Sequence, residues 1–233
     1  MGPQSFVRIG LVVAWFAYPV IATTQRSGQL QPDVTGDTDG RHAWMTAVYQ
    51  DLIVRKLVNP AKGSLSIDVR HELDVVTISA DATGPLKISR GRRKVLVSSA
   101  ESLAEARQML GGSDGVSQLL ALERRSVRLR SAPEVALLST IAFVGSLAGD
   151  EGAPGRLHDR AVNDPLWFKP APSDRCAPEY AVRSSEAWDL AHACLGDDHA
   201  SGDGLLVCRL KWFLQAEAAW FTYLNCVSPV VRP

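Results

Sequence analysis

Residues 64–98, SLSIDVRHELDVVTISADATGPLKISRGRRKVLVS, decide the fold of this chain. Within them Leu65, Ile67 and Val69 alternate with polar residues, a period of two that is typical of a strand with one buried face. Three more β-rich runs follow, at residues 73–80, 86–89 and 94–98. We therefore expect a small, mostly antiparallel sheet.

A helix is expected directly before this sheet. Residues 42–58 place Trp44, Val48 and Leu52 four residues apart, and Pro60 follows the segment. A spacing of four is typical of one face of a helix, and a proline commonly ends one. The pattern therefore predicts a helix over residues 42–58.

More helices are expected after the sheet. Residues 133–148 are apolar on nearly every side, and Ser131 with Glu134 forms a capping-box pattern before them. A helix that is apolar all round lies in the centre of a core. Shorter helices are expected after Ser98 and Asp114. The predicted fold class is therefore α+β, with a buried central helix.

The chain has four cysteines, all in its last quarter: Cys176, Cys194, Cys208 and Cys226. The pairs Cys194/Cys208 and Cys176/Cys226 share a midpoint at Ser201, as expected for a helical hairpin linked at both ends. Cys208 and Cys226 lie on one predicted helix, about 27 Å apart, which is too far for a disulfide. Two connectivities remain, and the hairpin favours Cys194–Cys208 with Cys176–Cys226. A four-cysteine zinc site is the alternative, but no C-x-x-C pair is present.

The N-terminus has the pattern of a signal peptide. An uncharged run of 14 residues, 9–22, follows Arg8 and is too short to span a bilayer, which takes about 20 residues. Val20 and Ala22 suit a cleavage site, so we expect residues 1–22 to be removed from a periplasmic or secreted protein. No transmembrane span is expected after cleavage. The rest divides into a flexible segment, 23–41, an α+β core, 42–149, and a long loop with the disulfide-linked helical hairpin, 150–233.

Charge is balanced overall but unevenly placed. The formal net charge is zero, which argues against a specific nucleic-acid binder. Residues 85–130 carry ten Lys/Arg and four Asp/Glu, whereas residues 150–204 carry five and eleven. Such runs commonly lie on solvated faces. The alternative is a basic patch for a protein or an anionic surface, at the turn formed by Arg90, Arg92, Arg93 and Lys94.

Motifs for catalysis are weak. Residues 111–115 match G-x-S-x-G, but a helix is expected before Ser113, where a nucleophile elbow has a strand. Paired carboxylates also occur at Asp150-Glu151, close to His158-Asp159, where turn and cap roles are the simpler interpretation.

A metal site is a further possibility near the hairpin turn. Imidazole and carboxylate groups there suit zinc or manganese, although loop aspartates are more commonly turn formers. We expect no bound metal and no other cofactor. The candidate ligands are His192, His199, Asp189 and Asp198.

The leading hypothesis is an exported, non-catalytic binding or structural protein. The second is a hydrolase that uses His and Asp residues around the long loop and the hairpin turn. The layout of a helix, a small sheet, a buried helix and a helical C-terminal part is similar to that of small zincin-like peptidases. In that family the buried helix carries the metal-binding histidines. Residues 133–148 contain none, so the similarity implies at most a degenerate peptidase.

Overall fold

The computed structural model describes residues 31–59, 61–81, 85–123, 131–163, 168–196 and 203–227. The predicted signal peptide lies outside these residues. Some side chains within the helices also lie outside the description, those of His192 and Cys194 among them.

Within the described residues, seven strands form one sheet in which neighbours along the sequence are neighbours in space, and every pair is antiparallel. The fold class is α+β, as predicted. The sheet is larger than the sequence indicated, because it begins within the segment expected to be flexible. The strands are β1 Asp33–Thr38, β2 Ala43–Tyr49, β3 Leu52–Asn59, β4 Ser64–His71, β5 Asp74–Ala80, β6 Leu86–Arg90 and β7 Arg93–Val97.

The helix predicted for residues 42–58 is wrong, because these residues form the hairpin of β2 and β3. A spacing of four is also a multiple of two, so it fits one face of a strand as well as one face of a helix. The turn between the strands contains Gln50, which has a positive φ of 52°. Neither Gln50 nor the following Asp51 is a strong turn signal, so the hairpin was missed.

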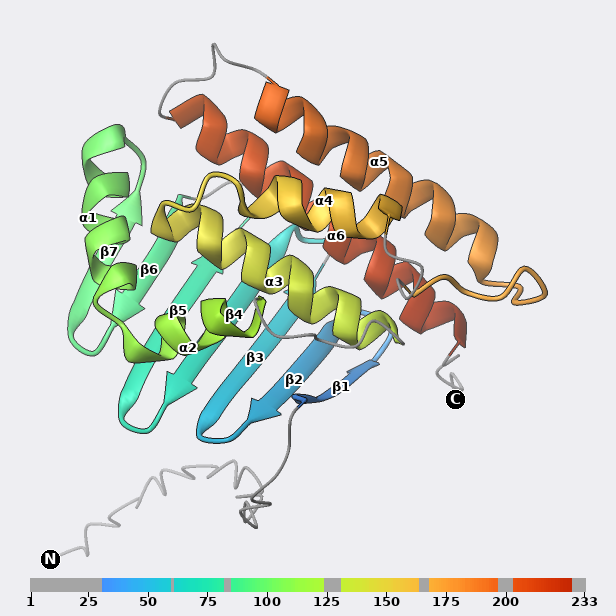
Figure 1. Ribbon diagram of the computed structural model, residues 1–233, viewed down its shortest axis with the longest axis horizontal. Coiled ribbons are helices and arrows are strands. Elements are labelled where there is room, and N and C mark those ends of the chain that lie inside the picture. The colour runs from blue at the N-terminus through green and yellow to red at the C-terminus, as the bar shows by residue number, and fades with distance from the viewer. Residues whose placement is uncertain are drawn as a thin grey trace, which may run out of the picture.

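The six helices in the described part of the chain cover one face of the sheet (Figure 1). Of these, α1, α2, α3 and α6 lie against strands, whereas α5 packs mainly on α6 and α4 on α3 and α5. The molecule therefore has a sheet layer, a helical layer and a partial outer helical layer. Their bounds are α1 Ala100–Gly111, α2 Asp114–Glu123, α3 Ala132–Ala148, α4 Ala153–Asn163, α5 Ala177–Gly196 and α6 Asp203–Val227.

Helix α3 is the buried central helix that the sequence predicted. Every residue from Val135 to Leu147 is buried. Ser131 caps the helix by accepting a hydrogen bond from the Glu134 backbone N–H, and Gly149 ends it with a positive φ of 105°. α3 lies against β1 and β2 and is surrounded by α1, α2, α4 and α6.

The long irregular connection expected from residue 150 is also wrong, because α4 and most of the first half of α5 lie there. Both helices have a proline as their second residue, Pro154 in α4 and Pro178 in α5. Proline is tolerated in the first turn, where its missing N–H has no partner in the helix. The residues that suggested a loop therefore mark two helix starts.

Helices α5 and α6 form the predicted hairpin (Figure 1). The Cys176–Cys226 disulfide is confirmed, with a Cα–Cα distance of 5.7 Å. Cys208 is disulfide-bonded as well, but the side chain of Cys194, its predicted partner, lies outside the described residues. Within the described residues, no helix is long and apolar enough to cross a membrane.

Candidate functional site

Most of the predicted metal ligands lie outside the described residues. Asp198 and His199 belong to the segment between α5 and α6, and the His192 side chain is not described either. Asp189 is exposed on α5. Among the described side chains, no group of three or more potential ligands could hold a metal ion. The expectation of no bound metal, with these four residues as candidate ligands, therefore remains a prediction.

Ser113 has the surroundings of a helix cap. Its side chain is buried, donates a hydrogen bond to Asp74 Oδ2 at 2.7 Å and accepts one from the Val116 backbone N–H at 3.2 Å. Burial raises the pKa of Asp74, but hydrogen bonds from Ser113 and Arg90 outweigh it and lower the pKa below its ordinary value. Ser113 thus joins the start of α2 to β5.

The carboxylate cluster that begins at Asp150 forms ion pairs between helices. Arg156 on α4 contacts Asp150 at 2.6 Å and Glu123, the last residue of α2, at 2.9 Å. Hydrogen bonds to these carboxylates raise the pKa of the Arg156 guanidinium. Glu151 lies 3.3 Å from Arg107 on α1. The cluster connects α1, α2 and α4 to the α3–α4 turn, and ion pairing explains these carboxylates without acid–base chemistry.

The basic turn lies at the end of the β6–β7 hairpin, where its residues are divided between the two faces of the sheet. Arg90 Nε donates to Asp74 Oδ1 at 2.7 Å, and Arg93 lies 3.7 Å from Glu105 on α1. Lys94 is opposite Ser89, on the face without helices, and both Arg92 and Lys94 are exposed. These four residues therefore form a basic edge of the sheet. Carboxylates contact two of the four basic side chains, those of Arg90 and Arg93.

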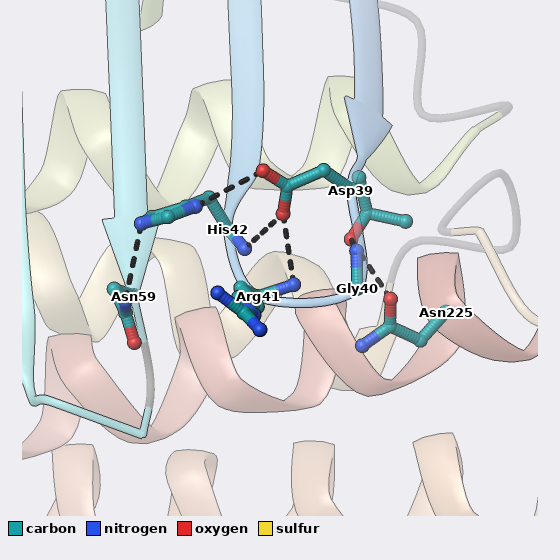
Figure 2. Close-up of polar contacts among 7 residues, drawn as sticks. Asp39, Gly40, Arg41, His42, Asn59 and Asn225 are labelled. Atoms are coloured by element: carbon teal, nitrogen blue, oxygen red, sulfur yellow. Dashed lines mark hydrogen bonds and ion pairs between the residues drawn. The ribbon is translucent and has the colours of Figure 1, made fainter. Parts of the chain in front are cut away.

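A polar cluster that the sequence analysis missed closes the β1–β2 turn (Figure 2). Asp39 accepts hydrogen bonds from the backbone N–H groups of Arg41 and His42 and from the His42 ring. The backbone hydrogen bond from His42 contributes most to lowering the pKa of Asp39 to about 2. The Asp39-Gly40 pair was the available sequence signal, since Asp-Gly is a strong hairpin turn.

The ring of His42 has both nitrogens occupied. Asn59 Oδ1 accepts from the Lys62 backbone N–H, so its amide nitrogen faces His42 Nε2 at 3.1 Å. The neutral ring therefore accepts at Nε2 and donates from Nδ1 to Asp39. A general base needs a free nitrogen for its substrate, so the arrangement fits a structural role better than a catalytic one.

The sequence analysis also missed a buried ion pair between β3 and α6. Lys56 Nζ lies 2.6 Å from Glu217 Oε1, and the side chains are 0% and 1% exposed. Lys56 also donates to the Ala136 carbonyl oxygen at 3.0 Å and lies 4.7 Å from the centre of the Trp220 ring. The only signal was the adjacent pair Arg55-Lys56 within a strand, because one of two neighbours must point inward.

Burial is the largest influence on the pKa values of both Lys56 and Glu217. It lowers the pKa of Lys56 and raises the pKa of Glu217, and the attraction between the partners opposes both shifts. Glu217 Oε2 has no hydrogen-bond partner among the described residues, and neither do the buried indole nitrogens of Trp212 and Trp220. The pair is closed to solvent and connects β3 to α6 within the core.

The opposite face of the sheet carries no described helix. Side chains alternate between the two faces, so the half-buried and exposed strand residues share this open face. Trp44 and Leu57, which are directly opposite each other, are 39% and 47% exposed. A polar row crosses the face from β2 to β7 and consists of Thr46, Arg55, Asp68, Thr77, Ser89 and Lys94.

Two hollows meet where the β4–β5 and β6–β7 turns lie. The smaller has a volume of about 250 Å³ and is formed by β3, β4 and β5 on the open face. The larger, about 580 Å³, is a shallow depression that includes Arg90, Arg93 and the C-terminal end of α1. Val75 lines both, and Leu73, which lines the larger one, is 99% exposed. The two hollows therefore adjoin at Val75, one on the open face and the other beside α1.

Comparison with known proteins gives no match. No family model, no curated protein and no solved structure is significantly similar to this sequence.

Proposed function

We propose that this protein is an exported, non-catalytic binding protein that holds an acidic protein partner around the β4–β5 turn, where the two hollows adjoin. The observation that carries the proposal is that Val75 lines both hollows, beside the fully exposed Leu73. A large exposed apolar side chain beside arginines is typical of an interaction surface.

Charge supports an acidic partner. The surface around the hollows has more basic than acidic side chains: Arg55, Arg70, Arg90, Arg92, Arg93 and Lys94, against Asp68, Glu72, Asp74 and Glu105. Opposite charge on a partner would increase its association rate and fix its orientation.

The distribution of charge favours a protein over a membrane. Asp33 and Asp37 lie on β1, at the far edge of the same open face. An anionic bilayer covering the face would meet these carboxylates as well as the arginines. A protein surface can present acidic groups to the hollows and other groups to β1, so it matches the uneven charge better.

Export rests on the sequence pattern and on the disulfide. Disulfides persist in oxidising compartments, and Cys176–Cys226 links the two ends of the helical hairpin. Intact-mass measurement of exported protein should give a mature form that begins at Thr23. A full-length form that retains Met1 in the membrane fraction would contradict export with cleavage.

Binding is tested by a photo-reactive amino acid in place of Leu73. Val182 on α5, which is 58% exposed, is the matched control because it is also a large apolar residue, far from the hollows in the sequence and on another layer. We expect one defined acidic protein from the exported fraction to crosslink at position 73 and not at 182. The adduct should disappear when Arg92→Glu and Arg93→Glu are combined.

Two results would reject the surface. One is the absence of an adduct at position 73, and the other is the same adduct at both positions. Binding to anionic phospholipid vesicles that is lost in the Arg92→Glu/Arg93→Glu variant would replace the protein partner with a membrane.

A further inference from the structure

The smaller hollow has the composition of an anion-binding site. Its lining is Ile53, Arg55, Asp68, Arg70 and Val75. The strand register places Arg70 opposite Ile53 on one side and Val75 on the other, while Arg55 is opposite Asp68. The hollow thus combines two guanidinium groups with two aliphatic walls.

Both guanidinium groups are available to a ligand. Among the described residues, neither Arg55 nor Arg70 forms an ion pair. Asp68 is the cross-strand neighbour of Arg55, but its Oδ1 accepts a hydrogen bond from Thr77 Oγ1 at 2.6 Å. Residues placed diagonally on adjacent strands, as Arg55 and Arg70 are, lie close enough for long side chains to reach one ligand.

The charge of the hollow selects the kind of anion. Arg55 and Arg70 contribute two positive charges and Asp68 one negative charge, which leaves a balance of +1. A carboxylate neutralises that charge, whereas a phosphate dianion would leave an excess of negative charge beside Asp68. Arginine also matches the planar carboxylate with paired hydrogen bonds.

We propose that this hollow is a subsite for a single carboxylate attached next to an apolar group. Arg55 and Arg70 hold the carboxylate, and the apolar group contacts Ile53 and Val75. The inference rests on the proposed function in taking the carboxylate from the acidic partner. Two groups on a protein could supply this carboxylate: the side chain of an Asp or Glu residue, or the free C-terminus.

The test is an NMR titration of the ¹⁵N-labelled mature protein with small probes. N-acetylvaline represents a free C-terminal carboxylate, N-acetyl-Val-Glu-amide an acidic residue, and N-acetylvalinamide is the neutral control. We expect a carboxylate probe to shift the amide signals of Ile53, Asp68 and Val75. Arg55→Gln and Arg70→Gln should each weaken the binding of this probe at least about fivefold, because each variant loses one charge-assisted hydrogen bond to the carboxylate.

A control variant and a control anion separate this site from general attraction. Arg41→Gln removes an exposed arginine from the β1–β2 turn and should leave the affinity unchanged. Inorganic phosphate should bind more weakly than the better carboxylate probe. Tighter binding of N-acetylvaline would identify a free C-terminus as the source of the carboxylate. Tighter binding of N-acetyl-Val-Glu-amide would identify an acidic side chain.

Several outcomes would overturn the subsite. One is that N-acetylvalinamide binds as tightly as the carboxylate probes. Another is that Arg55→Gln and Arg70→Gln bind the carboxylate probe as tightly as the wild type does. A third is that inorganic phosphate binds more tightly than the carboxylate probes. If the probes fail while the crosslink at position 73 forms, the subsite is wrong and the proposed function stands. If the probes bind and the crosslink does not form, the subsite stands without the protein partner.

Discussion

Arg55 and Lys56 are neighbours on β3 and carry the same charge, yet they lie in opposite environments. Lys56 points to the helices, is fully buried and contacts Glu217 at 2.6 Å. Arg55 points to the open face and lines a hollow without an ion pair to a described residue. The inner face therefore uses its charges for structure, and the outer face leaves its charges available for binding.

The largest expected effect is at the buried pair. Lys56→Met or Glu217→Leu alone leaves an unpaired charge in the core, so each should lower the free energy of unfolding by about 3–5 kcal/mol. The double variant removes both charges and should recover most of that loss. Denaturant unfolding of the three variants measures this. Additive losses in the double variant would show that the two residues act independently.

A matched pair of isoleucines extends the comparison to apolar residues. Ile67 on β4 is fully buried on the inner face, whereas Ile53 on β3 is only partly buried on the outer face. Ile67→Ala should cost about 2–5 kcal/mol, as a large-to-small change in a core does. Ile53→Ala should cost less than about 1 kcal/mol. Equal losses in thermal or denaturant unfolding would mean that the outer face is covered in solution.

A small effect on stability, confined to acidic pH, is expected at the β1–β2 turn. Because the folded-state pKa of Asp39 is lowered from 3.8 to about 2, its ionised form contributes stability above pH 4 that is lost as the pH falls toward 2. Asp39→Asn should therefore reduce the pH dependence in that window. The change should stay below about 1 kcal/mol, since the side chain is half exposed. An unchanged pH profile in Asp39→Asn would contradict the hydrogen bonds assigned to this carboxylate.

The sequence predicted the parts of the fold that have strong periodicity. The strands around Ile67, the buried helix ending at Ala148 and the Cys176–Cys226 disulfide follow from periods and midpoints that local physics imposes. The β2–β3 hairpin was missed because a spacing of four fits both a helix and a strand. The start of α4 was missed because Pro154 commonly ends helices but is also tolerated in their first turn.

The candidate site was harder to predict than the fold. Arg90 to Lys94 were recognised from their charge, but Arg55 and Arg70 are 15 residues apart and meet only through the register of β3 with β4. The buried Lys56–Glu217 pair joins residues 161 apart. Long-range contacts of this kind depend on how the layers pack, which no local pattern in the sequence specifies.

The most direct test compares the two neighbours on β3 in one experiment. Arg55→Gln and Lys56→Met are each measured for the free energy of unfolding and for the affinity of the tighter-binding carboxylate probe. We predict that Arg55→Gln changes the free energy of unfolding by less than about 0.5 kcal/mol. It should lower the affinity for the probe at least about fivefold. Lys56→Met should lose about 3–5 kcal/mol while its folded fraction binds the probe as the wild type does. A destabilised Arg55→Gln with unchanged probe affinity would contradict the division of roles between the two faces.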